Sequence, residues 1–339
     1  MKRDLTVGGL TAAPGTMVTG FLKAGELSDG VSPIAIPVML LNGAAEGPTV
    51  YLHVGAHGQE PFYAIEAMRR LTGEALRPER LRGNVIIVPA ANLLAFQAAT
   101  RVAPQYAARE QRPFAGDLHR GWPGRADGFL TERVEATIWA EIVRQSDHVV
   151  DYHSVGLPGI GFSHLYTGGT KDARETPVWE ATLRLAQAAG LTILVAGLAD
   201  TLPGMCLDAG KPAVMMELPA ARVISDDVVV TTMRCTLNML VALGVLEGSP
   251  QALDCLVVPG LHRTMPSIRA NHGGLISYAV EPGVPLKAGT VIARIHDVFG
   301  TELEAVTMPA DGYVHTFPPV SWVGAQMVAS GDWVADLFE

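Results

Sequence analysis

The chain has 339 residues, of which 48% are hydrophobic and 17% charged, and its formal net charge is −9. This composition is typical of a folded protein with enough material for two domains, and it argues against disorder. The negative charge and the absence of a long Lys/Arg cluster argue against nucleic acid as a partner, and the absence of an eighteen-residue apolar run argues against a membrane span.

The predicted elements begin with a β-rich segment, residues 1 to about 45, which we expect to pair into the main sheet. Short apolar runs rich in β-branched residues then alternate with segments of helical periodicity. The runs predict strands within 48–55, 83–92, 147–156, 191–197 and 212–219. The periodic segments predict helices within 60–71, 131–145, 175–190 and 226–244. This alternation predicts an α/β fold with a mostly parallel, mixed sheet and helices on both faces.

The pattern changes at about residue 256. Helical periodicity fades, and short strand-like runs alternate with turns such as EPGVPLKAG, MPADG and ASGDW. Pro and Gly at these points are typical of tight turns between short strands. We therefore predict a catalytic-type α/β domain over residues 1–255 and a small all-β domain over residues 256–339.

The N-terminus and the cysteines predict the compartment. MKRDLTVGGL contains no apolar segment after its early cations, so we expect no secretory signal. Cys206, Cys235 and Cys255 are odd in number and widely spaced, and we expect buried free thiols in a reducing cytoplasm. A homo-oligomer is compatible with the sequence, which does not decide the oligomeric state.

Polar side chains follow two of the predicted strands. His57 and Glu60 come just after the run TVYLHV, and His153 ends the run VVDYH. In such sheets functional groups gather at the carboxyl ends of the strands, and two imidazoles with one carboxylate can form a zinc site with one open position. Asp151 lies two residues before His153, on the same face of the strand, and could orient its imidazole. His53 competes as a ligand, but its place inside the apolar run favours a core histidine.

Three further residues are candidates for chemistry. Glu217 ends the apolar strand PAVMMELP, where burial would raise the pKa of its carboxyl group and suit it to proton transfer. A structural ion pair is the alternative. Arg120, in DLHRGWPG, and Arg101, in AATRVAP, could hold a carboxylate, although surface arginines are common.

Taken in order, the motifs GAHGQE, TR, DLHRGWPG, DYHS and MMELP resemble the succinylglutamate desuccinylase/aspartoacylase family of the zinc carboxypeptidase-like superfamily. The resemblance runs from about Thr49 to the C-terminus. It implies one zinc ion per chain, held by His57, Glu60 and His153. It also implies that Glu217 activates the water and that Arg101 polarises the scissile carbonyl.

The same resemblance implies that Arg120 grips a substrate carboxylate, and at this place the chain departs from the family. The family pattern reads Asp-Leu-Asn-Arg, whereas His119 replaces the asparagine here. Leu93 likewise replaces a proline after Asn92, which keeps its place as a substrate-binding candidate. A histidine is bulkier and can be neutral or cationic, so the preference for a carboxylate substrate is open.

The C-terminal part resembles a lipoyl- or biotinyl-like barrel-sandwich domain. A carrier function needs a lysine at a hairpin tip, and the corresponding region here, IHDVFGTELEAV, contains none. We expect this domain to shape the entrance of the site or an oligomer interface. His272, at its start, is a candidate to reach the site, although a loop histidine without a role is the alternative.

The sequence therefore predicts a zinc-dependent hydrolase that cleaves an N-acyl amide bond of a small molecule. The alternatives are a zinc carboxypeptidase-type peptidase and a non-catalytic binding protein on the same scaffold. The acyl group, the amine and the native divalent metal are not readable from the sequence.

Overall fold

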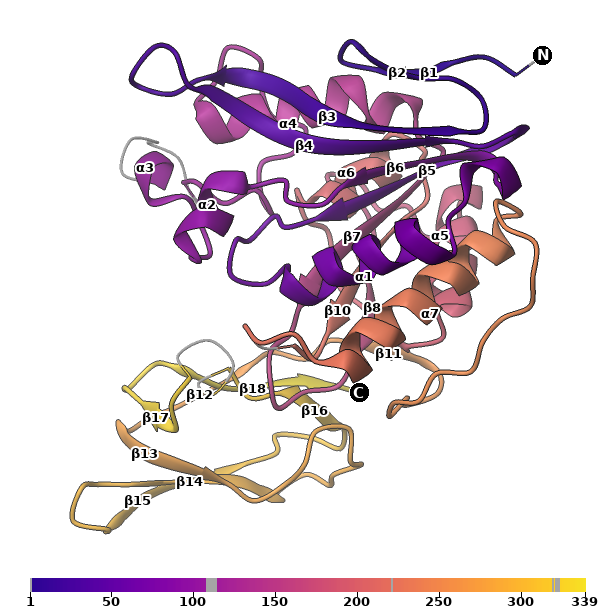
Figure 1. The fold of residues 1–339 in the computed structure, drawn as a ribbon. Coiled ribbons are helices and arrows are strands. Elements are labelled where there is room, and N and C mark those ends of the chain that lie inside the picture. The colour runs from indigo at the N-terminus through magenta and orange to yellow at the C-terminus, as the bar shows by residue number, and fades with distance from the viewer. Residues whose placement is uncertain (1, 108–114, 221, 319, 321–323) are drawn as a thin grey trace.

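The computed structural model describes residues 2–107, 115–220, 222–318, 320 and 324–339. A nine-stranded mixed sheet forms the centre of the larger domain, in the order β11-β9-β8-β10-β7-β5-β6-β4-β3 (Figure 1). Its strands are β3 (Thr16–Glu26), β4 (Pro33–Asn42), β5 (Ala45–Val54), β6 (Arg82–Val88), β7 (His148–Ser154), β8 (Phe162–Leu165), β9 (Thr192–Val195), β10 (Ala213–Leu218) and β11 (Leu261–Arg263). A separate hairpin, β1 (Leu5–Val7) and β2 (Leu10–Ala12), precedes them.

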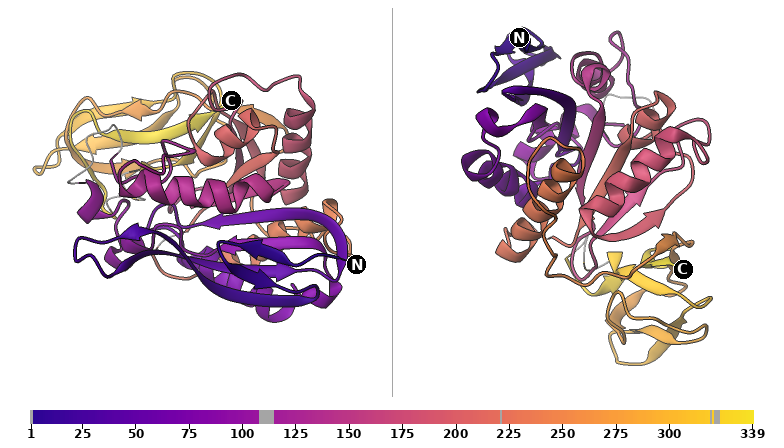
Figure 2. Two further views of the ribbon diagram at one scale, coloured as in Figure 1. Left: turned by 90° about the horizontal axis from the view of Figure 1, so that it is seen from above. Right: turned by 90° about the vertical axis from the view of Figure 1, so that its right-hand side faces the viewer.

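Helices cover both faces of this sheet (Figure 2). The described helices are α1 (Phe62–Glu74), α2 (Leu93–Ala98), α3 (Pro104–Ala107), α4 (Leu130–Glu141), α5 (Pro177–Ala189), α6 (Leu202–Asp208) and α7 (Asp226–Ala242), with short 3-10 turns at Pro78–Arg80 and Val143–Gln145. One core lies under α1, α5 and α7, where Leu71, Leu185 and Leu240 pack against the sheet. The other core lies under α4, α6 and the N-terminal hairpin.

The predicted fold class is confirmed, and the sheet is more mixed than expected. The strands β5, β6, β7 and β10 run parallel to their neighbours in the centre. In contrast, β8 is antiparallel to β10, and β3 and β4 form an antiparallel edge. The sequence pattern did not predict β8, α2, α3 or α6, all of which are short. The strand β8 has only four residues and carries Ser163 and His164 in place of an apolar run.

The C-terminal domain consists of two small antiparallel sheets packed face to face. Its strands are β12 (Ile268–Arg269), β13 (Gly274–Tyr278), β14 (Val291–His296), β15 (Glu302–Thr307), β16 (Tyr313–Thr316), β17 (Met327–Val328) and β18 (Trp333–Phe338). Ile276, Ile295 and Leu337 lie in the core between the sheets. The main sheet extends past the expected boundary at residues 255 and 256, because β11 pairs with β9 before the chain enters the β domain.

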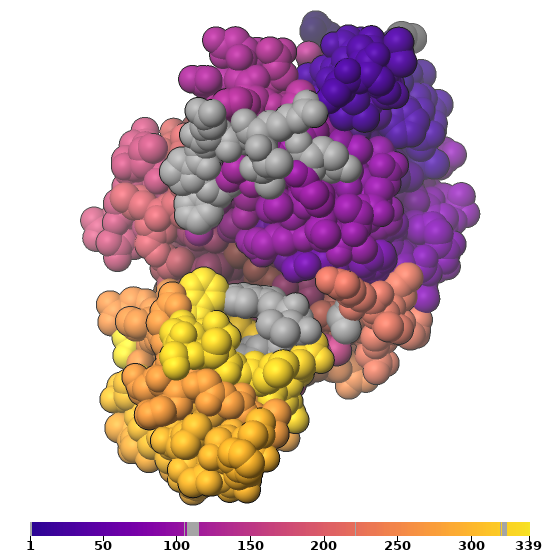
Figure 3. All heavy atoms as spheres, turned by 90° about the vertical axis from the view of Figure 1, so that its left-hand side faces the viewer, coloured from indigo at the N-terminus to yellow at the C-terminus, as the bar shows by residue number. Residues whose placement is uncertain are grey.

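The two domains share an apolar contact. Val155 and Phe162 of the larger domain pack with Phe338 of β18. Thr316 of β16 donates a hydrogen bond to the carbonyl oxygen of Val155, 3.2 Å away, and Ile160 donates its N–H to the carbonyl oxygen of His315. In Figure 3 the C-terminal domain lies against the larger domain, and the surface is recessed where they meet. The strand β7 therefore leads directly into the domain contact.

Two further predictions concern the exposure of the cysteines and the presence of a membrane-spanning helix. All three cysteines are free, as expected, but Cys255 is exposed, so the prediction that every thiol is buried is wrong. Cys255 lies in the segment between α7 and β11, where its neighbours Asp254 and Leu256 are exposed as well. Among the described helices, none has the length and hydropathy to cross a membrane.

Candidate active site

A glycine-rich loop between β5 and α1 carries two of the predicted ligands. The chain leaves β5 through Gly55, whose φ of +80° favours glycine. His57 and Glu60 follow, with Gly58 between them. A Cβ added to Gly58 would lie 1.9 Å from the backbone of Ala95 in α2, so only glycine allows α2 to pack this closely. Close packing on α2 therefore sets the position of the loop.

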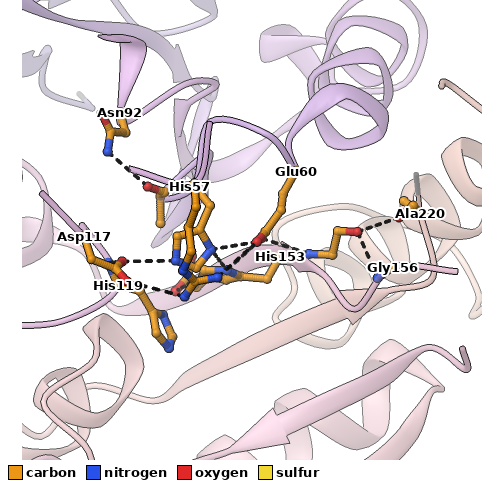
Figure 4. Close-up of polar contacts among 12 residues, drawn as sticks. His57, Glu60, Asn92, Asp117, His119, His153, Gly156 and Ala220 are labelled. Atoms are coloured by element: carbon orange, nitrogen blue, oxygen red, sulfur yellow. Dashed lines mark hydrogen bonds and ion pairs between the residues drawn. The ribbon is translucent and has the colours of Figure 1, made fainter. Parts of the chain in front are cut away.

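The structure brings the three predicted metal ligands together (Figure 4). Nδ1 of His57 lies 2.9 Å from Oε1 of Glu60, and Nδ1 of His153 lies 3.3 Å from Oε2 of the same carboxylate. The two Nδ1 atoms are 3.2 Å apart. Both histidines are buried, so two imidazole nitrogens and one carboxylate converge on a single point shielded from solvent.

A carboxylate lies against the far nitrogen of each histidine. Nε2 of His153 is 3.2 Å from Oδ2 of Asp151, so the expected contact is present. Nε2 of His57 is 3.1 Å from Oδ1 of Asp117, a partner that the sequence analysis did not name. The sequence did contain a signal for this partner, since Asp117 is the first residue of the motif DLHR. Hydrogen bonds of this kind orient metal-binding imidazoles and increase their basicity.

These carboxylates also change the proton affinity of the cluster. Burial alone would lower the pKa of His153, but Asp151 and Glu60 raise it well above its usual value. Burial would raise the pKa of Glu60, yet His57 and His153 lower it well below its usual value. The side chains of His57, Glu60 and His153 therefore favour one positive charge placed among them, which a proton or a metal cation can provide.

Glu217 lies beside this cluster and differs from the other carboxylates. It is paired in register with His153 on the neighbouring strand, so both side chains leave the same face of the sheet. Its Oε2 atom is buried and has no hydrogen-bond partner among the described residues. Burial raises the pKa of Glu217 to about 8. The carboxyl group therefore exchanges a proton near neutral pH, and it forms no ion pair with the residues that the structure describes.

Arg101 borders the same cluster from the segment after α2. Its Nη1 atom lies 3.6 Å from Oε1 of Glu60, and its Nη2 atom lies 3.4 Å from Oδ2 of Asp117. The side chain is 46% exposed, so the guanidinium reaches the site from its open side. This position puts a permanent positive charge beside the proposed metal ligands.

His119 and Arg120 lie next to each other at the site. The His119 ring centre is 4.8 Å from that of His153 and 5.5 Å from that of His57. Burial lowers the pKa of His119 well below its usual value, so its imidazole is neutral. Nη1 of Arg120 lies 3.5 Å from Oδ1 of Asp200. His119 therefore adds a bulky neutral ring beside the two predicted ligands His57 and His153.

Asn92 and His272, two predicted substrate-binding residues, make their described contacts outside the cluster of His57, Glu60 and His153. Asn92 caps α2 by accepting the N–H of Ala95, and its amide nitrogen lies 3.3 Å from the carbonyl oxygen of Ala56. It thus holds α2 against the ligand loop. His272 is exposed in the C-terminal domain, where its contacts are with Glu304. The structure does not bring His272 to the metal ligands.

His53 is a core histidine, in line with the favoured interpretation. Its Nδ1 atom lies 2.5 Å from the hydroxyl oxygen of Tyr51, and burial lowers its pKa to about 4. It faces Asp151 from the neighbouring strand at 4.0 Å, which is too long for a hydrogen bond. His53 therefore lies behind the cluster and is not one of the three converging ligands.

The donor set is suitable for zinc. Two imidazoles oriented by carboxylates, together with one carboxylate, are the ligands of many hydrolytic zinc sites. The partnerless oxygen of Glu217 lies beside this set, where a proton acceptor is needed. The residues present therefore fit a catalytic metal with room for one further ligand.

The fold and this site define an α/β domain that carries a cluster of two histidines and one glutamate at the carboxyl ends of its central strands. Residues 46–243 match the family model described as the succinylglutamate desuccinylase/aspartoacylase catalytic domain. The chain belongs to this family. A curated relative is the N-alpha-acetyl-L-2,4-diaminobutyric acid deacetylase of Halomonas elongata, which is 32% identical over 293 residues, covering 82% of this chain and 80% of the relative.

Solved structures with the same fold cover both domains. The ectoine utilization protein EutE (DoeB) of Ruegeria pomeroyi, in a product-bound form, has a TM-score of 0.79 and 24% identity, covering 95% of this chain and 94% of the other. A succinylglutamate desuccinylase of Silicibacter has a TM-score of 0.77 and 23% identity, covering 95% of each chain. At these identities the likeness shows the fold alone, including the C-terminal β domain.

Proposed function

We propose that this protein is a zinc-dependent hydrolase that cleaves the N-acyl amide bond of an amino acid or related small molecule. The observation that carries the proposal is the convergence of His57, Glu60 and His153 beside Glu217, whose Oε2 atom has no hydrogen-bond partner among the described residues. Family membership and the deacetylase named in Halomonas elongata support the reaction class.

The three converging side chains would hold one zinc ion. When bound, zinc would lower the pKa of a water molecule and polarise the substrate carbonyl. Asp117 and Asp151 hold the two imidazoles with their Nδ1 atoms toward the carboxylate of Glu60, where the zinc ion would bind. The positive charge would also lower the pKa of Glu217 and make its carboxylate form available near neutral pH.

Glu217 then accepts a proton from the attacking water as the oxygen bonds to the carbonyl carbon. Arg101 stabilises the negative charge that develops on the carbonyl oxygen. Glu217 returns the proton to the leaving nitrogen as the carbon–nitrogen bond breaks. The products are a carboxylate and an amine. Arg120, together with His119, binds a polar or anionic end of the substrate away from the scissile bond.

Metal content and amine release test this proposal together. We expect about one zinc per wild-type chain by elemental analysis and loss of that zinc in His153→Ala. We expect amine release from at least one member of a panel of N-acetyl and N-succinyl amino acids. Release from short peptides and not from this panel would indicate a peptidase. Wild type without stoichiometric metal, even after zinc is supplied, would refute the proposal.

A further inference from the structure

His53 is a fully buried histidine that takes no part in the proposed mechanism, although it lies directly behind the metal cluster. It belongs to β5, and its partner in the register of the parallel strand β7 is Asp151. Side chains at paired positions of neighbouring strands leave the same face of a sheet. The backbone pairing of two central strands therefore holds His53 beside Asp151.

The two atoms that face each other across this pair are both unsatisfied. Nε2 of His53 and Oδ1 of Asp151 are buried and have no hydrogen-bond partner among the described residues. They lie 4.0 Å apart. A buried polar atom without a partner is unfavourable, and more so when it belongs to a charged carboxylate. A movement of about 1 Å would bring the two atoms to hydrogen-bond distance.

The contact with Tyr51 indicates which nitrogen of His53 carries the proton. The Tyr51 hydroxyl lies 2.5 Å from Nδ1 of His53 and has no second partner among the residues that the structure describes. The ring is neutral at pH 7, because burial lowers the pKa of His53 to about 4, and a neutral imidazole has one N–H and one acceptor nitrogen. If Nδ1 carried the proton, the lone pair of Nε2 would face the carboxylate of Asp151, and two acceptors repel each other. The favoured arrangement has the Tyr51 hydroxyl donating to Nδ1 and the proton on Nε2.

This arrangement continues to a predicted metal ligand. Oδ2 of Asp151 lies 3.2 Å from Nε2 of His153, and Nδ1 of His153 lies at the cluster, 3.3 Å from Glu60. Every donor then has an acceptor. Tyr51 donates to His53, and both His53 and His153 donate to Asp151. The lone pair on Nδ1 of His153 is left free for a metal. A second donor on Asp151 also fixes the rotation of its carboxylate, and with it the orientation of the His153 ring.

A tryptophan holds the His53 ring from another element. The ring of Trp122 packs edge-on against that of His53, with a centre distance of 5.6 Å and an interplanar angle of 85°. Nε1 of Trp122 donates to the carbonyl oxygen of Leu118, 2.7 Å away, within the motif that also contains Asp117. Turning His53 away from Asp151 would disturb its contacts with Tyr51 and with Trp122.

We propose that His53 is a positioning residue for the zinc ligand His153, and that it acts by donating its Nε2–H to Asp151. Tyr51 holds His53 in the tautomer that can donate. The inference rests on the proposed function, because it takes His153 as a ligand of zinc. His53 touches neither the metal position nor the substrate. Hydrogen bonds that support such sites are often long in the unliganded protein and shorten on binding, so we expect the 4.0 Å contact to close in the zinc-loaded protein.

Zinc affinity, measured by competition with a chelator, tests the donor. His53→Phe keeps an aromatic ring against Trp122 but removes the N–H, and it should weaken zinc binding about tenfold. His53→Gln loses the aromatic ring but places an amide nitrogen near the Nε2 position, so its affinity should stay within about threefold of wild type. A role in packing alone predicts the opposite order, since phenylalanine fills the site better than glutamine.

A double-mutant cycle tests whether His53 acts through Asp151. In an Asp151→Ala background, which is itself weakened, the further change His53→Phe should alter the zinc affinity less than about twofold. If the two side chains acted independently, the same tenfold loss would appear in both backgrounds.

Two buried tyrosines provide a matched pair of variants. Tyr51→Phe and Tyr152→Phe each remove a hydroxyl with one hydrogen bond, and the partner of Tyr152 is Thr236 of α7, 2.8 Å away on the opposite face of the sheet. Both variants should lower the melting temperature, but only Tyr51→Phe should weaken zinc binding. Long-range 1H–15N spectra of histidine-labelled protein should show His53 protonated on Nε2 alone, its signals being those absent from His53→Phe.

Four results would overturn the inference: wild-type zinc affinity in His53→Phe, a weaker affinity in His53→Gln than in His53→Phe, equal zinc affinities of the two tyrosine variants, or a proton on Nδ1 of His53. Failure of the proposed function is seen separately, in wild type that lacks zinc or releases no amine from any N-acyl compound. The tautomer of His53 is read from the protein with or without zinc, so it tests the arrangement in either case.

Discussion

Glu217→Gln should stabilise the metal-free protein, and increasingly so as the pH rises. In the folded protein burial raises the pKa of Glu217 from 4.5 to about 8. The folded state therefore holds this proton more tightly than the unfolded state does. The contribution of this proton to the free energy of unfolding is complete below pH 4.5. It is lost as the pH rises through 8, because the buried carboxyl group must then carry a charge. Glutamine has the same shape and no charge, so it avoids this loss.

The magnitude follows from the change in pKa. A change of one in pKa corresponds to about 1.4 kcal/mol, so the full effect would be at most about 5 kcal/mol. Because Glu217 keeps part of its surface accessible, we expect about 2–4 kcal/mol at pH 9. For a chain of this size that corresponds to an increase of roughly 3–6 °C in the melting temperature. At pH 5 the variant and wild type should differ little.

Thermal unfolding of chelator-treated protein between pH 5 and 9 measures this effect. Chelation matters because a bound cation would stabilise the charged form of Glu217. Glu247→Gln, at an exposed site after α7, controls for the loss of a surface charge. If Glu217→Gln melted at or below the wild-type temperature at pH 9, the assignment of a strongly raised pKa would be refuted. The same variant should keep zinc and lose turnover by orders of magnitude, and near wild-type turnover would remove Glu217 from the mechanism.

Three further predictions concern the metal cluster. Asp117→Asn should weaken zinc binding about 10- to 100-fold in a competition titration, because it removes the carboxylate that orients His57; an unchanged affinity would show that the contact is incidental. Zinc affinity should fall as the pH is lowered, because the proton favoured by His153 in the apo site competes with the metal; a flat profile from pH 8 to 5 would contradict this. Gly58→Ala should lower both zinc content and melting temperature, since its Cβ would meet the backbone of Ala95 at 1.9 Å; Gly73→Ala, where a Cβ meets nothing within 4 Å, is the control.

Much of the fold was predictable because its signals are local. Apolar runs and helical periodicity indicated most central strands and the helices α1, α4, α5 and α7, and the change of pattern near residue 256 indicated a second domain. The elements that were missed, β8, α2, α3 and α6, are short and depend on their neighbours. The four residues of β8 form a strand because β9 and β10 provide hydrogen bonds on both sides.

The candidate site was also predictable only in part. The sequence indicated the candidate ligands, since His57, Glu60 and His153 lie at strand ends in a recognisable order. Contacts between distant segments were not readable. Asp117 reaches His57 over 60 positions of sequence, and the sequence analysis considered its motif only for Arg120 and His119. The C-terminal domain was expected to reach the site through His272, whereas the structure brings His315 to the domain contact.

The sequence by itself determined the fold class, the family and the three side chains that converge at the candidate site, because each depends on residue types in a local pattern. Only the tertiary structure decided which partners the polar side chains at the site have and in which direction their pKa values change. Burial and charge at one point in space raise the pKa of Glu217 and lower those of His164 and His315. No local pattern encodes these surroundings, since they come from strands and a second domain that meet only in the folded chain.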